Sequence, residues 1–405
     1  MSTGRRVRRV LSGMLALAMV LGVAYGAAAL LSPVPSWHVE QALSAADIDV
    51  AWGDELALDD TGSTAVNAPS GSTVAAGSAE PRPIAGAAKL VLVSVALAAE
   101  PLAVGGAGPA ITIDQAAVAR YRDLDAAGAR TVAVQFGQTW TRRDLIAATL
   151  IGSGNNTAEL LISTVFGDLD GYLAAARAWL DEQGLTSTSV VDGTGLDAAS
   201  RSTAVDLARI GRLALENAVL AELLTTRPAE SSAGARIDDE AGFVTGLGTI
   251  GLVRSYTDAA GVCVLLAVPA GDETIVIAML GQPGYPAAED AASAIIAALG
   301  EAVRPVEVVA AGQVVAIART PWGQSTELVA TESISVSSST LEGLDVRLDA
   351  ASRSTIVQGA DAGSLIVTAA GVEQVVRLES TSAITEPGIA WRFADPLTVI
   401  ERWTG

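Results

Sequence analysis

The sequence is poor in basic side chains. Its 405 residues include 25 Lys and Arg against 45 Asp and Glu, and four of the basic residues are arginines at positions 5, 6, 8 and 9. Beyond these four, 21 basic residues face 45 acidic ones. Binding to nucleic acid rests on clustered Lys and Arg, so we expect no nucleic-acid partner.

Three residue types occur once each: histidine at His38, cysteine at Cys263 and lysine at Lys89. A single His and a single Cys argue against a Ser-His-Asp triad, a zinc site with several His ligands and a structural disulfide. We therefore expect no metal and no cofactor. The absence of Cys near the N-terminus excludes a lipoprotein anchor, and the single lysine excludes any mechanism that needs two.

The N-terminus carries a long apolar run. After the basic tail, residues 1–9, residues 10–31 contain no charge and are long enough to cross a bilayer core of about 30 Å as a helix. Arginines before this run and acids after it predict a cytoplasmic N-terminus and a single-pass protein of the cell membrane, with most of the chain extracytoplasmic. A cleaved signal peptide is the alternative, since "AYGAAA" offers small residues for cleavage.

The remaining chain divides by pattern into three parts. Residues 32–53 are rich in small and polar types and are expected to form a stalk. Residues 54–302 mix helical and strand patterns, including helices that begin at the capping pairs Thr141/Asp144 and Thr203/Asp206. Residues 303–405 show short β-branched runs without helical period, which predicts a separate all-β domain.

Four segments in order resemble the serine-type D-alanyl-D-alanine carboxypeptidases, the low-molecular-mass penicillin-binding proteins. They are "PIAGAAK", "LIGSGNNTAELL", "WLDEQGLTSTSVVDGTGLDAASRSTAVDLARI" and "YTDAAGVC". The N-terminal anchor is similar to that of the actinobacterial branch. The resemblance implies an α/β (α+β) domain of the β-lactamase/transpeptidase type over residues 54–302, followed by the small all-β domain.

The resemblance also implies three catalytic elements. Ser-x-x-Lys at a helix N-terminus supplies the nucleophile and its base, Ser-x-Asn relays protons and holds the substrate, and Lys-Thr-Gly binds the substrate carboxylate. Here Lys89, Ser153 and Asn155 match the family pattern. The nucleophile position is Gly86, and Val253-Arg254-Ser255 stands where Lys-Thr-Gly is expected.

These departures predict a catalytically inactive homologue that acts in peptidoglycan metabolism of the cell wall. Its degenerate substrate-binding region would comprise Arg254, Ser255 and Thr257. The expected partners are the membrane, through the N-terminal helix, and a peptidoglycan stem peptide or a cell-wall synthesis protein. Two alternatives stay open: an active D,D-carboxypeptidase in which Ser153 attacks with Lys89 as its base, and a structural ectodomain whose cleft is vestigial.

Overall fold

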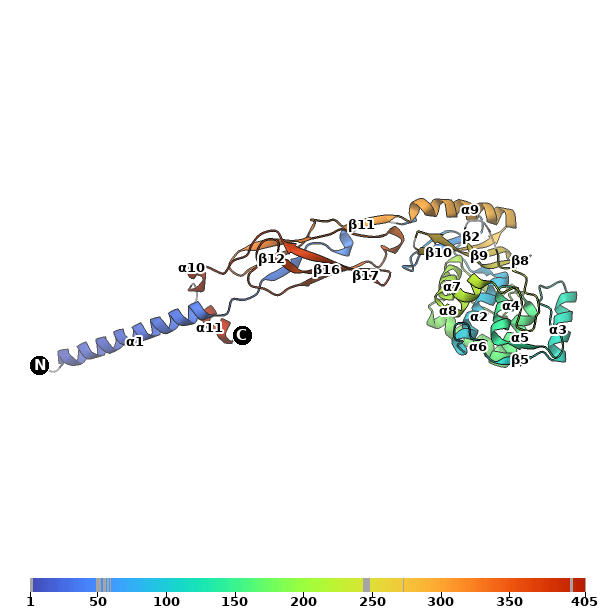
Figure 1. Ribbon diagram of the computed structural model, residues 1–405, viewed down its shortest axis with the longest axis horizontal. Helices are drawn as coiled ribbons and strands as arrows, with labels where there is room; N and C mark the ends of the chain where they lie inside the picture. Colours follow the sequence, from blue (N-terminus) through green and yellow to red (C-terminus); the bar gives the residue numbers. More distant parts are fainter. Residues whose placement is uncertain are drawn as a thin grey trace. The chain divides into compact units, whose positions relative to one another are not determined.

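The computed structural model describes residues 3–48, 52, 53, 56, 58, 60–242, 248–271, 273–393 and 396–404. The chain forms two compact units. One contains residues 51–304 and 337–342, and we call it the cleft unit. The other contains residues 1–50, 305–336 and 343–405, and we call it the β unit. The mixed α/β fold and the second, all-β domain expected from the sequence are confirmed (Figure 1).

The cleft unit is built on a five-stranded antiparallel sheet in the order β3-β2-β10-β9-β8. Its strands are β2 (Ser63–Asn67), β3 (Thr73–Gly77), β8 (Ile250–Thr257), β9 (Gly261–Ala270) and β10 (Glu273–Gln282). Both faces are buried. Along β9, Val262, Val264 and Leu266 join one core cluster, and the alternating residues Cys263 and Leu265 join the other. Because strand side chains alternate between faces, a continuous apolar run fits a sheet covered on both sides.

Helices cover both faces of this sheet (Figure 1). On one side α9 (Tyr285–Ala302) packs through Ala288, Ala292 and Ile295. On the other side lies a helical layer centred on α2 (Ala88–Ala99), which is buried over most of its length. That layer also contains α4 (Arg142–Leu150), α5 (Asn155–Phe166), α6 (Leu169–Glu182), α7 (Ala204–Glu216), α8 (Ala218–Thr226) and the peripheral α3 (Gln115–Ala126).

Local sequence signals set the starts of several of these helices. Thr141 and Asp144 form the predicted capping box of α4, with each side chain accepting a hydrogen bond from the other residue's backbone N–H. The Thr203 hydroxyl accepts a hydrogen bond from the Asp206 N–H at the start of α7, as its capping pattern predicts. Two short strand pairs lie in the segments between the helices. Strand β4 (Arg82–Pro83) pairs with β7 (Arg201–Ser202), and β5 (Ala110–Thr112) pairs with β6 (Thr139–Thr141).

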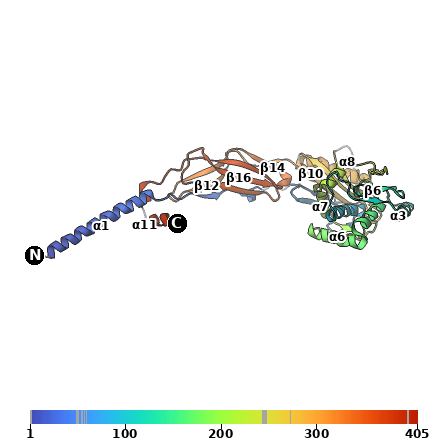
Figure 2. The ribbon, with the colours of Figure 1, turned by 60° about the horizontal axis from the view of Figure 1, so that its bottom comes forward.

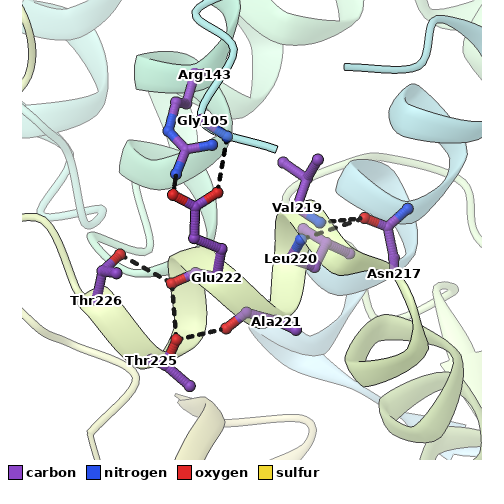
Figure 3. A network of polar contacts seen from close by, with 9 residues as sticks. All are labelled: Gly105, Arg143, Asn217, Val219, Leu220, Ala221, Glu222, Thr225 and Thr226. Atoms are coloured by element: carbon purple, nitrogen blue, oxygen red, sulfur yellow. Dashed lines mark hydrogen bonds and ion pairs between the residues drawn. The ribbon is translucent and has the colours of Figure 1, made fainter. Parts of the chain in front are cut away.

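A polar cluster at α8 ties three parts of the helical layer together (Figure 3). The Glu222 carboxylate accepts a hydrogen bond from the Gly105 N–H at 3.0 Å and pairs with the Arg143 guanidinium of α4 at 3.0 Å. Asn217 caps α8 by accepting hydrogen bonds from the N–H groups of Val219 and Leu220. The loop after α2 is thereby attached to both helices.

The β unit contains a six-stranded sheet in the order β1-β12-β13-β17-β16-β15 (Figure 2). The strands are antiparallel: β1 (His38–Gln41), β12 (Val314–Arg319), β13 (Ser325–Ala330), β15 (Asp345–Ala350), β16 (Asp361–Ala369) and β17 (Val372–Ser380). Separately, β11 (Pro305–Val309) pairs with β14 (Ile334–Ser337). Strand β1 falls within the residues expected to form a stalk, yet it hydrogen-bonds to β12 as an edge strand.

The β unit also contains helices from both ends of the chain. These are the N-terminal helix α1 (Thr3–Leu31) and, near the C-terminus, α10 (Ile389–Arg392) and α11 (Pro396–Thr404). Residues Val7–Leu31 are long and apolar enough to cross a membrane, and an 18-residue window within them has a mean hydropathy of 2.2. A signal sequence has the same properties. Short 3-10 helices complete the fold at Ala45–Asp47, Ala85–Ala87 and Ser338–Thr340.

Candidate active site

The first element of the site lies at the start of α2. The chain enters this helix through the 3-10 turn Ala85–Ala87, which contains Gly86. Ala85 has a positive φ of 45°, and Gly195 approaches it so closely that a Cβ on Gly195 would meet the Ala85 carbonyl oxygen. Only glycine fits such an approach. The Asp192–Asp197 loop is thereby held against the turn that carries Gly86.

Lys89, one helical turn after Gly86, is almost fully buried, with 4% of its surface exposed. Its Nζ donates a hydrogen bond to the Thr194 carbonyl oxygen at 2.8 Å. Burial lowers the pKa of Lys89 from 10.5 to about 7, the Asp192 carboxylate opposes that effect, and the Arg130 charge adds to it. A substantial fraction of the amine is therefore neutral at pH 7.

Gly86 places no side chain beside this amine. A Cβ built on Gly86 would lie 3.5 Å from Lys89 Nζ, 3.5 Å from Ser255 Oγ and 3.0 Å from Ser255 Cβ. A side chain at position 86 would thus point between Lys89 and strand β8. The Gly86 backbone does not have a positive φ, so its conformation does not require glycine.

The second element lies between α4 and α5, as its sequence predicts. Ser153 has a positive φ of 50° and lines the cleft. Asn155 begins α5 and is 2% exposed. Its Nδ2 donates a hydrogen bond to the Arg130 carbonyl oxygen at 2.9 Å, whereas its buried Oδ1 has no hydrogen-bond partner among the described residues. That oxygen is available to a ligand N–H group.

The third element is the central part of β8. Val253 is buried in the apolar core, so it presents no polar group to the cleft. The Arg254 guanidinium lies over the Tyr285 ring, 4.4 Å from its centroid. Ser255 is 7% exposed, and its Oγ has no hydrogen-bond partner in the described part of the chain. Thr257 Oγ1 accepts a hydrogen bond from the Ala260 N–H at 3.2 Å.

These elements surround one cleft of about 690 Å³. Of the residues singled out in the sequence, Gly86, Lys89, Ser153, Asn155, Ser255 and Thr257 line it, and Arg254 lines a small cavity that adjoins Gly86, Lys89 and Ser153. A second cavity, of about 760 Å³, shares Thr194 and Leu196 with the cleft but is lined by none of the predicted site residues. The residues singled out in the sequence therefore gather at the first cleft and not at the second cavity.

Several residues of the cleft carry no signal in the sequence alone. Asp125 lies near the end of α3, Arg130 follows that helix, and Tyr285 opens α9. The Arg130 guanidinium pairs with Glu240 at 3.1 Å, so that charge is partly compensated. Thr194 contributes only its carbonyl to Lys89, which any residue could do. Because these contacts depend on the folded backbone, residue spacing could not reveal them.

Known proteins are similar to this chain at the levels of sequence and fold. Residues 60–283 match the sequence model of the D-alanyl-D-alanine carboxypeptidase family. The D-alanyl-D-alanine carboxypeptidase DacB2 of Mycobacterium tuberculosis is 31% identical over 156 residues, which are 37% of this chain and 53% of DacB2. The chain thus spans about half the length of this curated relative.

Solved structures extend the likeness to the fold. A D-alanyl-D-alanine carboxypeptidase from Mycobacterium tuberculosis H37Rv is 28% identical with a TM-score of 0.51, over 63% of this chain and 97% of that one. Penicillin-binding protein 5 from Haemophilus influenzae is 16% identical with a TM-score of 0.55, over 81% of this chain and 98% of that one. With a family match over more than half of its residues, the chain belongs to the D-alanyl-D-alanine carboxypeptidase family.

Proposed function

We propose that this protein binds the peptide stem of peptidoglycan at the cell surface without forming the acyl-enzyme of its family. The observation that carries the proposal is that Gly86 places no side chain, and so no hydroxyl, beside Lys89. In the serine mechanism a hydroxyl attacks the peptide carbonyl and passes its proton to the neighbouring base. Gly86 has no oxygen to acylate, so Lys89 has no hydroxyl there to deprotonate.

Binding is supported by the polar groups that remain in the cleft. The cleft is open rather than filled by side chains, which is less consistent with a vestigial site. Asn155 Oδ1 and Ser255 Oγ are buried and unpartnered among the described residues, and such groups are usually satisfied by a ligand or water. A peptide backbone offers both the N–H and the carbonyl groups that these two atoms require.

Recognition of the terminal carboxylate would be weaker than in the family pattern. Val253 replaces the lysine of that element and lies in the core. Losing one charge-assisted hydrogen bond costs roughly 1.5–3 kcal/mol of binding free energy. Arg254, whose Nε has no hydrogen-bond partner among the described residues, is the nearest replacement cation on β8.

The N-terminal helix would hold the peptide-binding cleft unit at the membrane. Arginines precede Val7–Leu31, and acidic residues outnumber basic ones in the rest of the chain. The positive-inside rule then favours a cytoplasmic N-terminus and an extracytoplasmic cleft unit. A single-pass anchor of this kind would keep the cleft unit tethered to the outer surface of the membrane.

Calorimetric titration of the full-length chain with a pentapeptide ending in D-Ala-D-Ala tests the proposal, with D-alanine release followed in parallel. We expect saturable binding without release. The control is Asn155→Leu, which removes the cleft amide and should weaken binding at least about tenfold while circular dichroism verifies the fold. Release of D-alanine at a rate comparable to a serine enzyme, or no binding by either protein, would contradict the proposal.

A further inference from the structure

A groove of about 160 Å³ lies at the opposite end of α2 from Lys89. It opens where the C-terminal half of α2 meets α6, the end of α7 and the start of α8. Ala98, at its edge, follows Lys89 by nine residues, which is about 14 Å along a helix axis. No residue lines both this groove and the cleft, so the groove is a separate site in the described part of the cleft unit.

The walls of the groove come from helical residues spaced by four. Residues at this spacing lie on the same face of a helix. Three such pairs converge on the groove: Ser94 and Ala98 from α2, Trp179 and Gln183 from α6, and Leu213 and Asn217 from the end of α7. None of the described residues that line the groove is charged.

The polar groups of these walls are not used by the fold. Trp179 Nε1 and the Gln183 side-chain amide make no hydrogen bond to any described residue. Asn217 uses only its Oδ1, which accepts two N–H groups at the start of α8 (Figure 3), so its Nδ2 is left to donate. Ser94 Oγ is buried and has no partner among the described residues. The groove thus offers several neutral donors and one amide acceptor to a ligand.

We propose that this groove binds one sugar ring of a glycan, and that an N-acetylated amino sugar fits it best. Sugar hydroxyls both donate and accept hydrogen bonds, which matches uncharged amide, indole and hydroxyl groups. The half-buried Trp179 ring offers a negative face to the C–H groups of a pyranose. Leu213 provides an apolar contact for the acetamido methyl. A volume of about 160 Å³ suits a single ring, since a cavity of roughly 150 Å³ takes a benzene.

Charge separates this ligand class from others of similar size. A nucleotide or a free carboxylate requires a cation, and the described lining has none. A peptide in extended form needs a longer groove than one ring. The assignment of the sugar to a cell-wall glycan rests on the proposed function, because peptidoglycan carries its peptide stems on strands of N-acetylated sugars. The same polymer then supplies ligands for both the cleft and the groove.

Saturation-transfer NMR on the full-length chain in lipid nanodiscs tests the proposal, because detergents with sugar head groups would compete. The probe is triacetylchitotriose, which contains N-acetylated rings and no peptide. Ala98→Trp fills the groove from an exposed position of α2 without removing a polar group, and Gln183→Ala removes one amide. The matched control is Phe136→Ala, which removes an exposed aromatic ring of the same unit outside the groove.

We expect the probe to bind with a Kd of about 1 mM, as one ring-sized contact allows. Ala98→Trp should weaken binding at least about tenfold, and Gln183→Ala about threefold. Phe136→Ala should bind like the unmodified chain, with circular dichroism verifying the fold of each variant.

Two results would overturn the proposal: no binding by the unmodified chain up to about 20 mM probe, or equal binding by Ala98→Trp. Equal binding of cellotriose, which lacks acetamido groups, would contradict the assignment of an N-acetylated ring. The pentapeptide titration reads the cleft and this titration reads the groove. Either site can therefore fail its test while the other passes.

Discussion

At residue scale, two of the positions at which the site differs from its family pattern face each other. The pattern has serine at position 86 and glycine at position 255, and this chain has glycine and serine. A Cβ on Gly86 would lie 3.0 Å from Ser255 Cβ, tighter than nine in ten real Cβ contacts. The Ser255 side chain therefore occupies space that a serine at position 86 would need.

This pairing predicts that Gly86→Ser alone will not restore acylation. The double variant Gly86→Ser/Ser255→Gly removes the contact and places a hydroxyl near Lys89 Nζ. We expect the double variant to be acylated by benzylpenicillin at least about tenfold faster than the single variant, measured as the growth of the adduct mass. Ser255→Gly alone should show no acylation. Equal rates in the single and double variants would show that Ser255 does not obstruct the site.

At element scale, α2 is a buried helix with one ionisable group inside it. Ten of its twelve residues are buried, and Lys89 is among them. Lowering its pKa from 10.5 to about 7 means that the charged form is disfavoured in the folded chain. Between these two pH values the unfolded chain binds more protons than the folded one. Stability contributed by this group therefore rises with pH through this window, and the full cost of the buried charge is present below pH 7.

Lys89→Met should consequently stabilise the cleft unit at neutral and acidic pH. Removing the buried charge gains about 4–5 kcal/mol at pH 6.5, and the unpartnered Thr194 carbonyl costs about 1–3 kcal/mol. We expect a net gain of about 1–4 kcal/mol that declines as the pH approaches 10. Thermal unfolding of both proteins between pH 6.5 and 10 measures this difference. Arg122→Met, at an exposed position, is the control, and a pH-independent difference for Lys89→Met would contradict the account.

Some helix starts and some site residues could be predicted from short-range signals in the sequence, and others could not. Caps such as Thr141 and Thr203 act within a few residues, so the starts of α4 and α7 could be predicted. Lys89, Ser153 and Asn155 were identifiable because each lies in a short motif. Arg130 and Tyr285 reach the cleft only through tertiary packing, and no local pattern marks them. Strand β1 was missed because four mostly exposed residues show no apolar alternation.

At the scale of the whole molecule, the β unit is assembled from both ends of the chain. Strand β1 pairs with β12 across nearly three hundred residues, and most of the cleft unit, residues 51–304, is formed by the chain between them. Trp37, just before β1, is buried, and its Nε1 donates a hydrogen bond to the Ala351 carbonyl oxygen at 2.7 Å. The segment after α1 is thus part of the folded β unit.

Trp37→Ala should therefore destabilise the β unit. Truncating a buried tryptophan costs about 3–5 kcal/mol of unfolding free energy, because packing is lost and a cavity remains. We expect faster hydrogen exchange at the amides of β12, where β1 would detach more often. Val372→Ala, at an exposed position of β17, should leave these amides unchanged. Unaltered exchange in Trp37→Ala would mean that β1 contributes little to the unit.

The central claim, that the cleft cannot form the family's serine ester, is tested most directly by intact-mass analysis of the full-length chain after incubation with benzylpenicillin. Hydroxylamine treatment follows, because it cleaves an ester on serine and leaves an amide on Lys89 in place. The account predicts no hydroxylamine-sensitive adduct. A stoichiometric adduct that hydroxylamine removes, mapped to Ser153 or Ser255, would contradict it and identify a working nucleophile.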